Sequence, residues 1–138
     1  MVELNWLDGL GFEAKIPSGH KLVLDNSDPA SGGKNRGPSP METLLVAAAA
    51  CTAMDVISIL EKKRQKVTAY RIEIEGDRPP PGVWPRPFTK IRIHHILSGE
   101  KIDPIAVERA IELSETKYCS VMATVREKPK VEIDYKIE

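Results

Sequence analysis

The sequence lacks an excess of charge of either sign, because its 20 lysines and arginines balance its 20 aspartates and glutamates in 138 residues. A balanced chain with an isoelectric point near 6.8 offers no basic face, so neither nucleic acid nor a membrane is expected as a partner. The N-terminal stretch MVELNWLDG also lacks the basic and then apolar leader of a secretory signal. We therefore expect a cytoplasmic protein whose residues 1–138 form a single domain.

Cysteine is scarce as well, with only Cys51 and Cys119 in the chain. In a cytoplasmic protein, two cysteines are more readily redox-active or simply buried than part of a structural disulfide. They also lack the close spacing and the further ligands that a zinc site requires. His94 and His95 are adjacent in a predicted strand and so point to opposite faces, which prevents them from chelating one ion together. The sequence predicts neither a metal nor another cofactor.

The most distinctive stretch is residues 39–66, whose pattern predicts one long helix. Ser39 is a good N-cap, proline suits the first turn, and Glu42 completes a Ser-x-x-Glu capping box. Residues 43–54 carry no charge, and basic residues gather toward the C-terminal end, where the helix dipole is negative. A helix that is apolar nearly all round must be buried on most of its surface.

Cys51 lies in the middle of this helix, where a buried, inert thiol and a functional thiol are both reasonable interpretations. A membrane span is a further alternative, but the apolar stretch is near the lower limit of spanning length. It is also interrupted by Asp55, a serine and two threonines, which favours a buried core helix.

Around this helix the pattern alternates with a period of two, which indicates half-buried strands. A polar, glycine-rich loop over 25–38 leads into the helix and carries Arg36, the only arginine before it. The order of elements favours an α+β fold with antiparallel sheet. Strands are expected over 2–6, 12–16, 21–25, 68–75, 88–97 and 131–137, with a helix from Asp103 to about Tyr118 and a short helical turn opened by Cys119.

Two segments, GPSPMETLLVAAAAC at 37–51 and ETKYCSVMATV at 115–125, together resemble the OsmC/Ohr family of thiol-dependent peroxidases. The resemblance implies an intertwined homodimer with its sites at the subunit interface. It implies that Cys51 attacks the peroxide as a thiolate and that Cys119 then forms a disulfide with it, which an external dithiol reduces. An apolar, alanine-lined wall would suit organic hydroperoxides.

Two further residues are candidates for activating Cys51, and each has a simpler interpretation. In the family a glutamate directly after the helix-start proline pairs with an arginine, but here that position is Met41 and the glutamate is Glu42. Glu42 lies about 13.5 Å from Cys51 along the axis and on roughly the opposite face, so it could reach the thiol only from the other chain. Its alternative role is the capping box. Arg36 is the candidate arginine, and its alternative is a solvated loop charge.

Asp55 is unfavourable for activation of Cys51, because the two residues lie on the same face of the predicted helix. A carboxylate there disfavours the thiolate unless a cation neutralises it. The sequence thus predicts a thiol-dependent peroxidase that reduces organic hydroperoxides in oxidative-stress defence, with Cys51, Cys119, Arg36 and Glu42 as catalytic residues. The alternative is a non-catalytic dimer of the same fold that binds a small apolar ligand.

Overall fold

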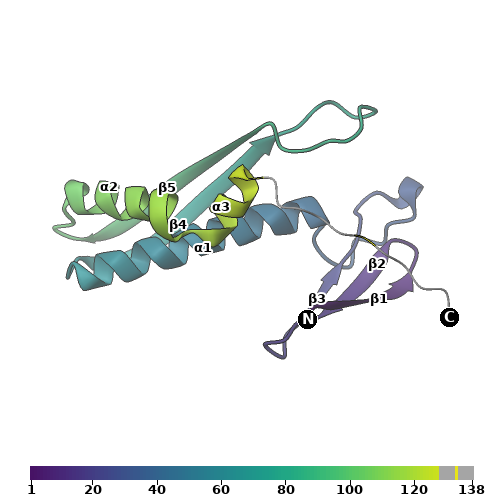
Figure 1. Cartoon of the computed structure of the whole chain (residues 1–138), viewed down its shortest axis with the longest axis horizontal. Coiled ribbons are helices and arrows are strands. Elements are labelled where there is room, and N and C mark those ends of the chain that lie inside the picture. Colours follow the sequence, from purple (N-terminus) through teal and green to yellow (C-terminus); the bar gives the residue numbers. More distant parts are fainter. Residues whose placement is uncertain (128–132, 134–138) are drawn as a thin grey trace. The chain divides into compact units, whose positions relative to one another are not determined.

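The computed structural model describes residues 1–127 and 133, and the strand expected over 131–137 lies outside the described residues apart from Ile133. The chain divides into two compact units, Met1–Val46 and the part that begins at Ala47. Each unit is an antiparallel sheet with helical segments attached (Figure 1). The α+β class and the antiparallel sheets predicted from the sequence are therefore confirmed.

The first unit contains a three-stranded meander in the order β1-β2-β3, formed by β1 (Glu3–Asp8), β2 (Gly11–Lys15) and β3 (Lys21–Leu24). Gly9 makes the turn between β1 and β2 with a φ of 52°, a conformation that glycine adopts without strain. The loop after β3 is not featureless, because it contains a short 3₁₀ turn, η1 (Pro29–Ser31), capped by Asp28. The meander predicted from the sequence is confirmed.

The long helix α1 (Pro40–Lys62) begins with the predicted capping box. Glu42 Oε2 accepts the Ser39 N–H at 2.7 Å, and Ser39 Oγ accepts the Glu42 N–H at 3.2 Å. The helix ends sooner than the basic run suggests. Arg64 adopts a positive φ of 56°, which leaves the helical region, and β4 already begins at Lys66.

The second unit contains a two-stranded antiparallel ribbon of β4 (Lys66–Asp77) and β5 (Lys90–Glu100), joined by the proline-rich segment 78–89. The strand expected over 88–97 ends later than predicted, because residues 98–100 continue β5. Ser98 pairs with Ala69 and Gly99 with Val67, across an irregularity in the register. A side chain at position 99 would come within 2.0 Å of the Lys66 carbonyl oxygen, so only glycine passes this point.

The described part of the second unit also contains three helical segments: α2 (Pro104–Leu113), the wide π-type turn η2 (Ser114–Tyr118) and α3 (Ser120–Arg126). Asp103 caps α2 and Cys119 caps α3, both as predicted. The core lies where α1 and α2 meet over the ribbon, and its fully buried members are Val56, Leu60 and Ala110. Burying a side chain such as Leu60 contributes about 1.5–3 kcal/mol.

Large apolar side chains of α1 remain exposed in the part of the single chain that the structure describes. Val46 and Met54 remain 62% and 68% exposed. Among the described residues, α1 is the one helix whose length and composition would allow it to cross a membrane. Its C-terminal half is nevertheless part of a packed core with α2 and the ribbon, which is the arrangement of a core helix.

Candidate functional site

Two thiols and a carboxylate converge in the second unit. Cys51 lies in the middle of α1, Asp55 lies one turn further along the same helix, and Cys119 caps α3. The two Sγ atoms and a carboxylate oxygen of Asp55 all lie within 4.8 Å of one another. Both cysteines are free thiols. The prediction that the two cysteines meet despite their separation in sequence is confirmed.

Ser114 holds the two halves of this cluster together from the end of α2. Its hydroxyl donates to Asp55 Oδ2 at 3.0 Å and lies 3.0 Å from Thr52 Oγ1. Because a hydroxyl has one hydrogen, Thr52 must then donate to Ser114. Ser114 is fully buried and Thr52 almost so, which makes this a chain of satisfied buried hydroxyls that ends on the carboxylate.

The wide turn η2 places Cys119 relative to Ser114. The Cys119 N–H donates to the Ser114 carbonyl oxygen at 2.9 Å, five residues back along the chain. The same serine therefore fixes the backbone of Cys119 and the side chain of Asp55. This local geometry brings the second thiol onto the face of α1 that carries the first.

Cys119 is the more protected thiol, at 4% exposure. Burial raises the pKa of the Cys119 thiol, the Met122 N–H group 3.5 Å from its sulfur opposes that rise, and the neighbouring Cys51 and Asp55 add to it. Cys119 is accordingly protonated at neutral pH. A protonated thiol is a weak nucleophile, so Cys119 is poorly suited to make the first attack on a substrate. It is better suited to a second step, after another residue has reacted.

A pocket of about 380 Å³ lies along the C-terminal half of α1, and Asp55 lines it whereas neither cysteine does. Its walls combine apolar and hydroxyl groups with two ammonium groups. The lining residues are Asp55, Ser58, Ile59, Lys62, Lys63, Leu113 and Tyr118. The pocket therefore offers space for a small molecule, and its lining on α1 begins one helical turn beyond Cys51 and runs on to Lys63.

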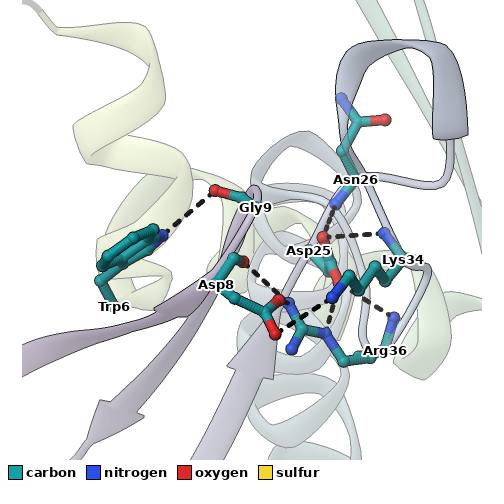
Figure 2. A network of polar contacts seen from close by, with 7 residues as sticks. All are labelled: Trp6, Asp8, Gly9, Asp25, Asn26, Lys34 and Arg36. Atoms are coloured by element: carbon teal, nitrogen blue, oxygen red, sulfur yellow. Dashed lines mark hydrogen bonds and ion pairs between the residues drawn. The ribbon is translucent and has the colours of Figure 1, made fainter.

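Arg36 belongs to the first unit, where it is held by two carboxylates (Figure 2). Its Nε donates to Asp25 Oδ2 at 2.8 Å, and its Nη2 lies 2.8 Å from Asp8 Oδ1 and donates to the Asp8 carbonyl oxygen at 3.0 Å. The Arg36 side chain is 31% exposed, while the Asp25 side chain is fully buried. Arg36 is thus a fixed, paired group, and the alternative of a solvated loop charge is wrong.

Asp25 is the centre of this network. It also accepts the backbone N–H groups of Asn26, Lys34 and Arg36 (Figure 2). The Arg36 guanidinium, together with these N–H groups, lowers the pKa of Asp25 to about 2, against the opposing effect of burial. A charged carboxylate therefore organises the loop that leads into α1.

Gly11 shows how closely the Arg36 side chain lies against the sheet. A methyl group at position 11 would stand 1.9 Å from Arg36 Nη2. Glycine is required there for the guanidinium to reach Asp8, which the sequence alone did not indicate.

Glu42 performs the capping role that the sequence offered as an alternative, and the Ser39 N–H lowers the pKa of Glu42. Arg36 and Glu42 belong to the first unit, whereas the thiol pair belongs to the second. Their participation at the thiols therefore stays a prediction.

Thr52 and Ser114 are the site residues that sequence reasoning missed. In the sequence, the helical spacing of residues 103–118 puts Ser114 on the same face as the apolar residues Val107, Ala110 and Ile111. A hydroxyl at the end of an apolar stripe must find a buried partner, and that requirement was the available signal.

Similarity to known proteins assigns the chain to a family. The family model described as "OsmC-like protein" matches residues 32–134. The chain belongs to the OsmC-like family. It is 38% identical over 134 residues to Protein YhfA of Escherichia coli K12, covering 97% of this chain and 95% of that protein.

Solved structures of similar chains agree with this assignment. A hypothetical protein from Aquifex aeolicus VF5 is 35% identical, with a TM-score of 0.77 and coverage of 91% of this chain and 86% of that one. An organic hydroperoxide resistance protein OsmC from Legionella pneumophila shares the fold at a TM-score of 0.63 and 14% identity, covering 91% and 89% of the two chains.

Proposed function

We propose that this OsmC-like protein is a thiol-dependent peroxidase that reduces organic hydroperoxides. The observation that supports the proposal is the convergence of Cys51 and Cys119 within 4.8 Å of each other, next to Asp55, which lines a pocket. Membership of a family whose structural relatives include organic hydroperoxide resistance proteins points in the same direction.

The proposed reaction proceeds in three balanced steps. The Cys51 thiolate attacks one peroxide oxygen, so that an S–O bond forms as the O–O bond breaks, and the departing alkoxide takes up a proton to leave as alcohol. Cys119, after losing its proton, attacks the resulting sulfenic sulfur, and an S–S bond forms as hydroxide leaves and is protonated to water. An external dithiol then reduces the disulfide by thiol–disulfide exchange.

The raised pKa of Cys119 supports this division of roles. Cys51 is the more accessible thiol and is the proposed nucleophile. The resemblance to the family implies an arginine, paired with a glutamate, that activates the first cysteine. We further propose that Arg36 takes this role, supported by Glu42, from the same chain or from a second copy.

We also propose that the protein is a cytoplasmic homodimer. The support is the uncovered apolar surface of α1, above all Val46 and Met54. Burial of such a surface by a second copy would contribute about 25 cal/mol for each Å² removed from water. Sedimentation should give a dimer, and a well-behaved monomer at micromolar concentration would contradict it.

The deciding experiment is consumption of an organic hydroperoxide with a dithiol as reductant, by wild type, Cys51→Ser and Cys119→Ser. Wild type should turn over, Cys51→Ser should be inactive, and Cys119→Ser should be inactivated after the first turnovers by over-oxidation of Cys51. Equal consumption by wild type and Cys51→Ser would overturn the proposal.

A second candidate is a dimer that binds a small apolar ligand without catalysis. The observation in its favour is Asp55, whose carboxylate lies against the thiols and disfavours a thiolate there. A wild-type Cys51 that is no more reactive than a free thiol toward iodoacetamide would make this candidate the better account.

A further inference from the structure

The thiol pair and Asp55 form a set of three donors that no peroxidase step requires. Reduction of a hydroperoxide uses two sulfurs, and a carboxylate beside them hinders the ionisation on which the first step depends. The structure nevertheless places this carboxylate within 4.8 Å of both sulfurs and holds it there through Ser114. The position of Asp55 therefore needs a different explanation.

We propose that the reduced protein binds one thiophilic divalent cation, with zinc as the natural choice, through Cys51 Sγ, Cys119 Sγ and an oxygen of Asp55. Two sulfurs and one oxygen are a donor set that zinc accepts, whereas magnesium and calcium require oxygen ligands throughout. The proposal goes beyond the proposed peroxidase function and does not depend on it.

The spacing of the donors fits such an ion. Zinc bonds of about 2.3 Å to sulfur and about 2.0–2.2 Å to oxygen place these tetrahedral ligand atoms roughly 3.5–3.8 Å apart. The three atoms here lie within 4.8 Å of one another, so small side-chain rotations complete the geometry. Three protein ligands leave a fourth position for water or a substrate.

The surroundings of the donors also fit. Ligating carboxylates are normally oriented by a hydrogen bond to a group outside the ligand set, and Ser114 Oγ donates that bond to Asp55 Oδ2 at 3.0 Å. Cys119 is buried and Cys51 half-buried, so an ion at this point would be largely shielded from water. Its two positive charges would offset the three negative charges that the ligands carry when the thiols ionise.

The ion and the hydroperoxide would compete for the same sulfurs. A hydroperoxide, two protons and the zinc dithiolate give the alcohol, water, the protein disulfide and free zinc ion, so the sulfurs are oxidised and the peroxide is reduced. A disulfide lacks the two thiolate donors, so oxidation would release the ion.

Cobalt is the probe for the test, because the charge-transfer absorption of thiolate-bound cobalt in the near ultraviolet reports sulfur ligation directly. Fully reduced, metal-free protein should bind one cobalt per chain with this absorption, and zinc should displace it. Either a stoichiometry far from one or a cobalt spectrum without the thiolate absorption would overturn the proposal.

Matched variants locate the ion. Asp55→Asn removes the charged oxygen but keeps an acceptor for Ser114, and Glu61→Gln removes an exposed carboxylate from the same helix. Asp55→Asn should lower zinc affinity at least tenfold, Ser114→Ala should lower it by about 10–100-fold, and Glu61→Gln should leave it unchanged. Equal affinity in Asp55→Asn and Glu61→Gln would exclude the site.

The outcome is separable from peroxidase activity. Turnover of hydroperoxide without cobalt binding would reject the metal site and leave the proposed function intact. One-to-one thiolate binding of cobalt without turnover would do the reverse. Release of bound zinc to a chelating dye on addition of hydroperoxide should parallel the loss of free thiols, and zinc retained in the disulfide form would contradict ligation by both sulfurs.

Discussion

Ser114 Oγ donates a hydrogen bond to Asp55 Oδ2 at 3.0 Å across 59 residues of sequence. Through this bond the end of α2 is joined to the face of α1 that carries Cys51. Since the Ser114 carbonyl oxygen also accepts the Cys119 N–H, one residue sets the relative positions of both thiols and the carboxylate.

Ser114→Ala should therefore destabilise the second unit. The substitution leaves Thr52 and Asp55 without their shared partner, and a buried polar group left unsatisfied costs about 1–3 kcal/mol. The measurement is urea unfolding monitored by circular dichroism. Ser120→Ala is the control, because Ser120 is exposed and should alter stability by less than about 0.5 kcal/mol. Equal effects of the two substitutions would show that the hydroxyl chain contributes no stability.

Asp55→Asn should make Cys119 more reactive. The negative charge of Asp55 is one of the causes of the raised pKa of Cys119, so its removal lowers that pKa. Burial, the largest cause, remains, and the effect is therefore partial. Alkylation of Cys119 by iodoacetamide in a Cys51→Ser background at neutral pH should become faster. An unchanged rate, with Glu61→Gln as the control, would show that the carboxylate does not act on the thiol.

Arg36→Ala should slow alkylation of Cys51 at neutral pH if this arginine activates the thiol. Arg36→Ala also leaves the buried Asp25 carboxylate without its ion-pair partner. A second variant, Arg36→Lys, is therefore needed, because it keeps the positive charge but loses the paired geometry of the guanidinium. Slow alkylation in both variants with an unchanged fold indicates a role for the guanidinium. Wild-type rates in both would remove Arg36 from the site.

Arg36 and Asp25 also predict a response to acid. The pKa of Asp25 is about 2 in the folded state, below its ordinary value of 3.8. Because the folded pKa is depressed, the stabilisation is complete above 3.8 and is lost as the pH falls toward 2. The first unit should thus loosen in this range, as seen by the fluorescence of Trp6, and Asp25→Asn should be less stable than wild type at neutral pH and show a weaker acid response.

His95 predicts a second dependence on pH, at milder acidity. Its Nδ1 lies 2.6 Å from the Tyr70 hydroxyl, and burial lowers the pKa of His95 below 6.5. The unfolded chain binds the proton more readily, so this stabilisation is present above 6.5 and is lost as the pH falls through the lowered value. When the pH is lowered from about 7.5 to about 5.5, the midpoint of urea unfolding should decrease in wild type and should decrease less in His95→Gln. His94→Gln should change this response only slightly, because His94 contributes less than burial to the lowered pKa of His95.

Much of the fold depends on local patterns that the sequence displays openly. Several predicted features depend on only a few neighbouring residues, and each is confirmed. They are the capping box at Ser39 and Glu42, the alternation of the strands, and the caps at Asp103 and Cys119. The errors are also local. The chain leaves α1 before its last basic residues, and residues 98–100 extend a strand because a glycine passes a close backbone contact.

The site was less accessible to this reasoning, because its contacts join residues far apart in the sequence. Cys51, Cys119 and Asp55 could be named, but their meeting depends on Ser114, whose two hydrogen bonds no periodicity reveals. The expectation that no metal binds rested on cysteines and histidines alone and did not consider Asp55; it stays a prediction, which the cobalt titration tests against the proposed site. The pairing of Arg36 with Asp25 and Asp8 was hidden for the same reason.

The wide turn from Ser114 to Tyr118 has a consequence for how this chain can vary. Each residue added to a helix rotates the rest of the chain by about 100°, so one insertion or deletion between Ser114 and Cys119 would turn the second sulfur away from α1. The proline-rich connection between β4 and β5 contributes no donor to the cluster, so a change in its length leaves the cluster intact. Relatives that keep the thiol pair should therefore differ in the length of that connection while conserving the spacing of Ser114 and Cys119.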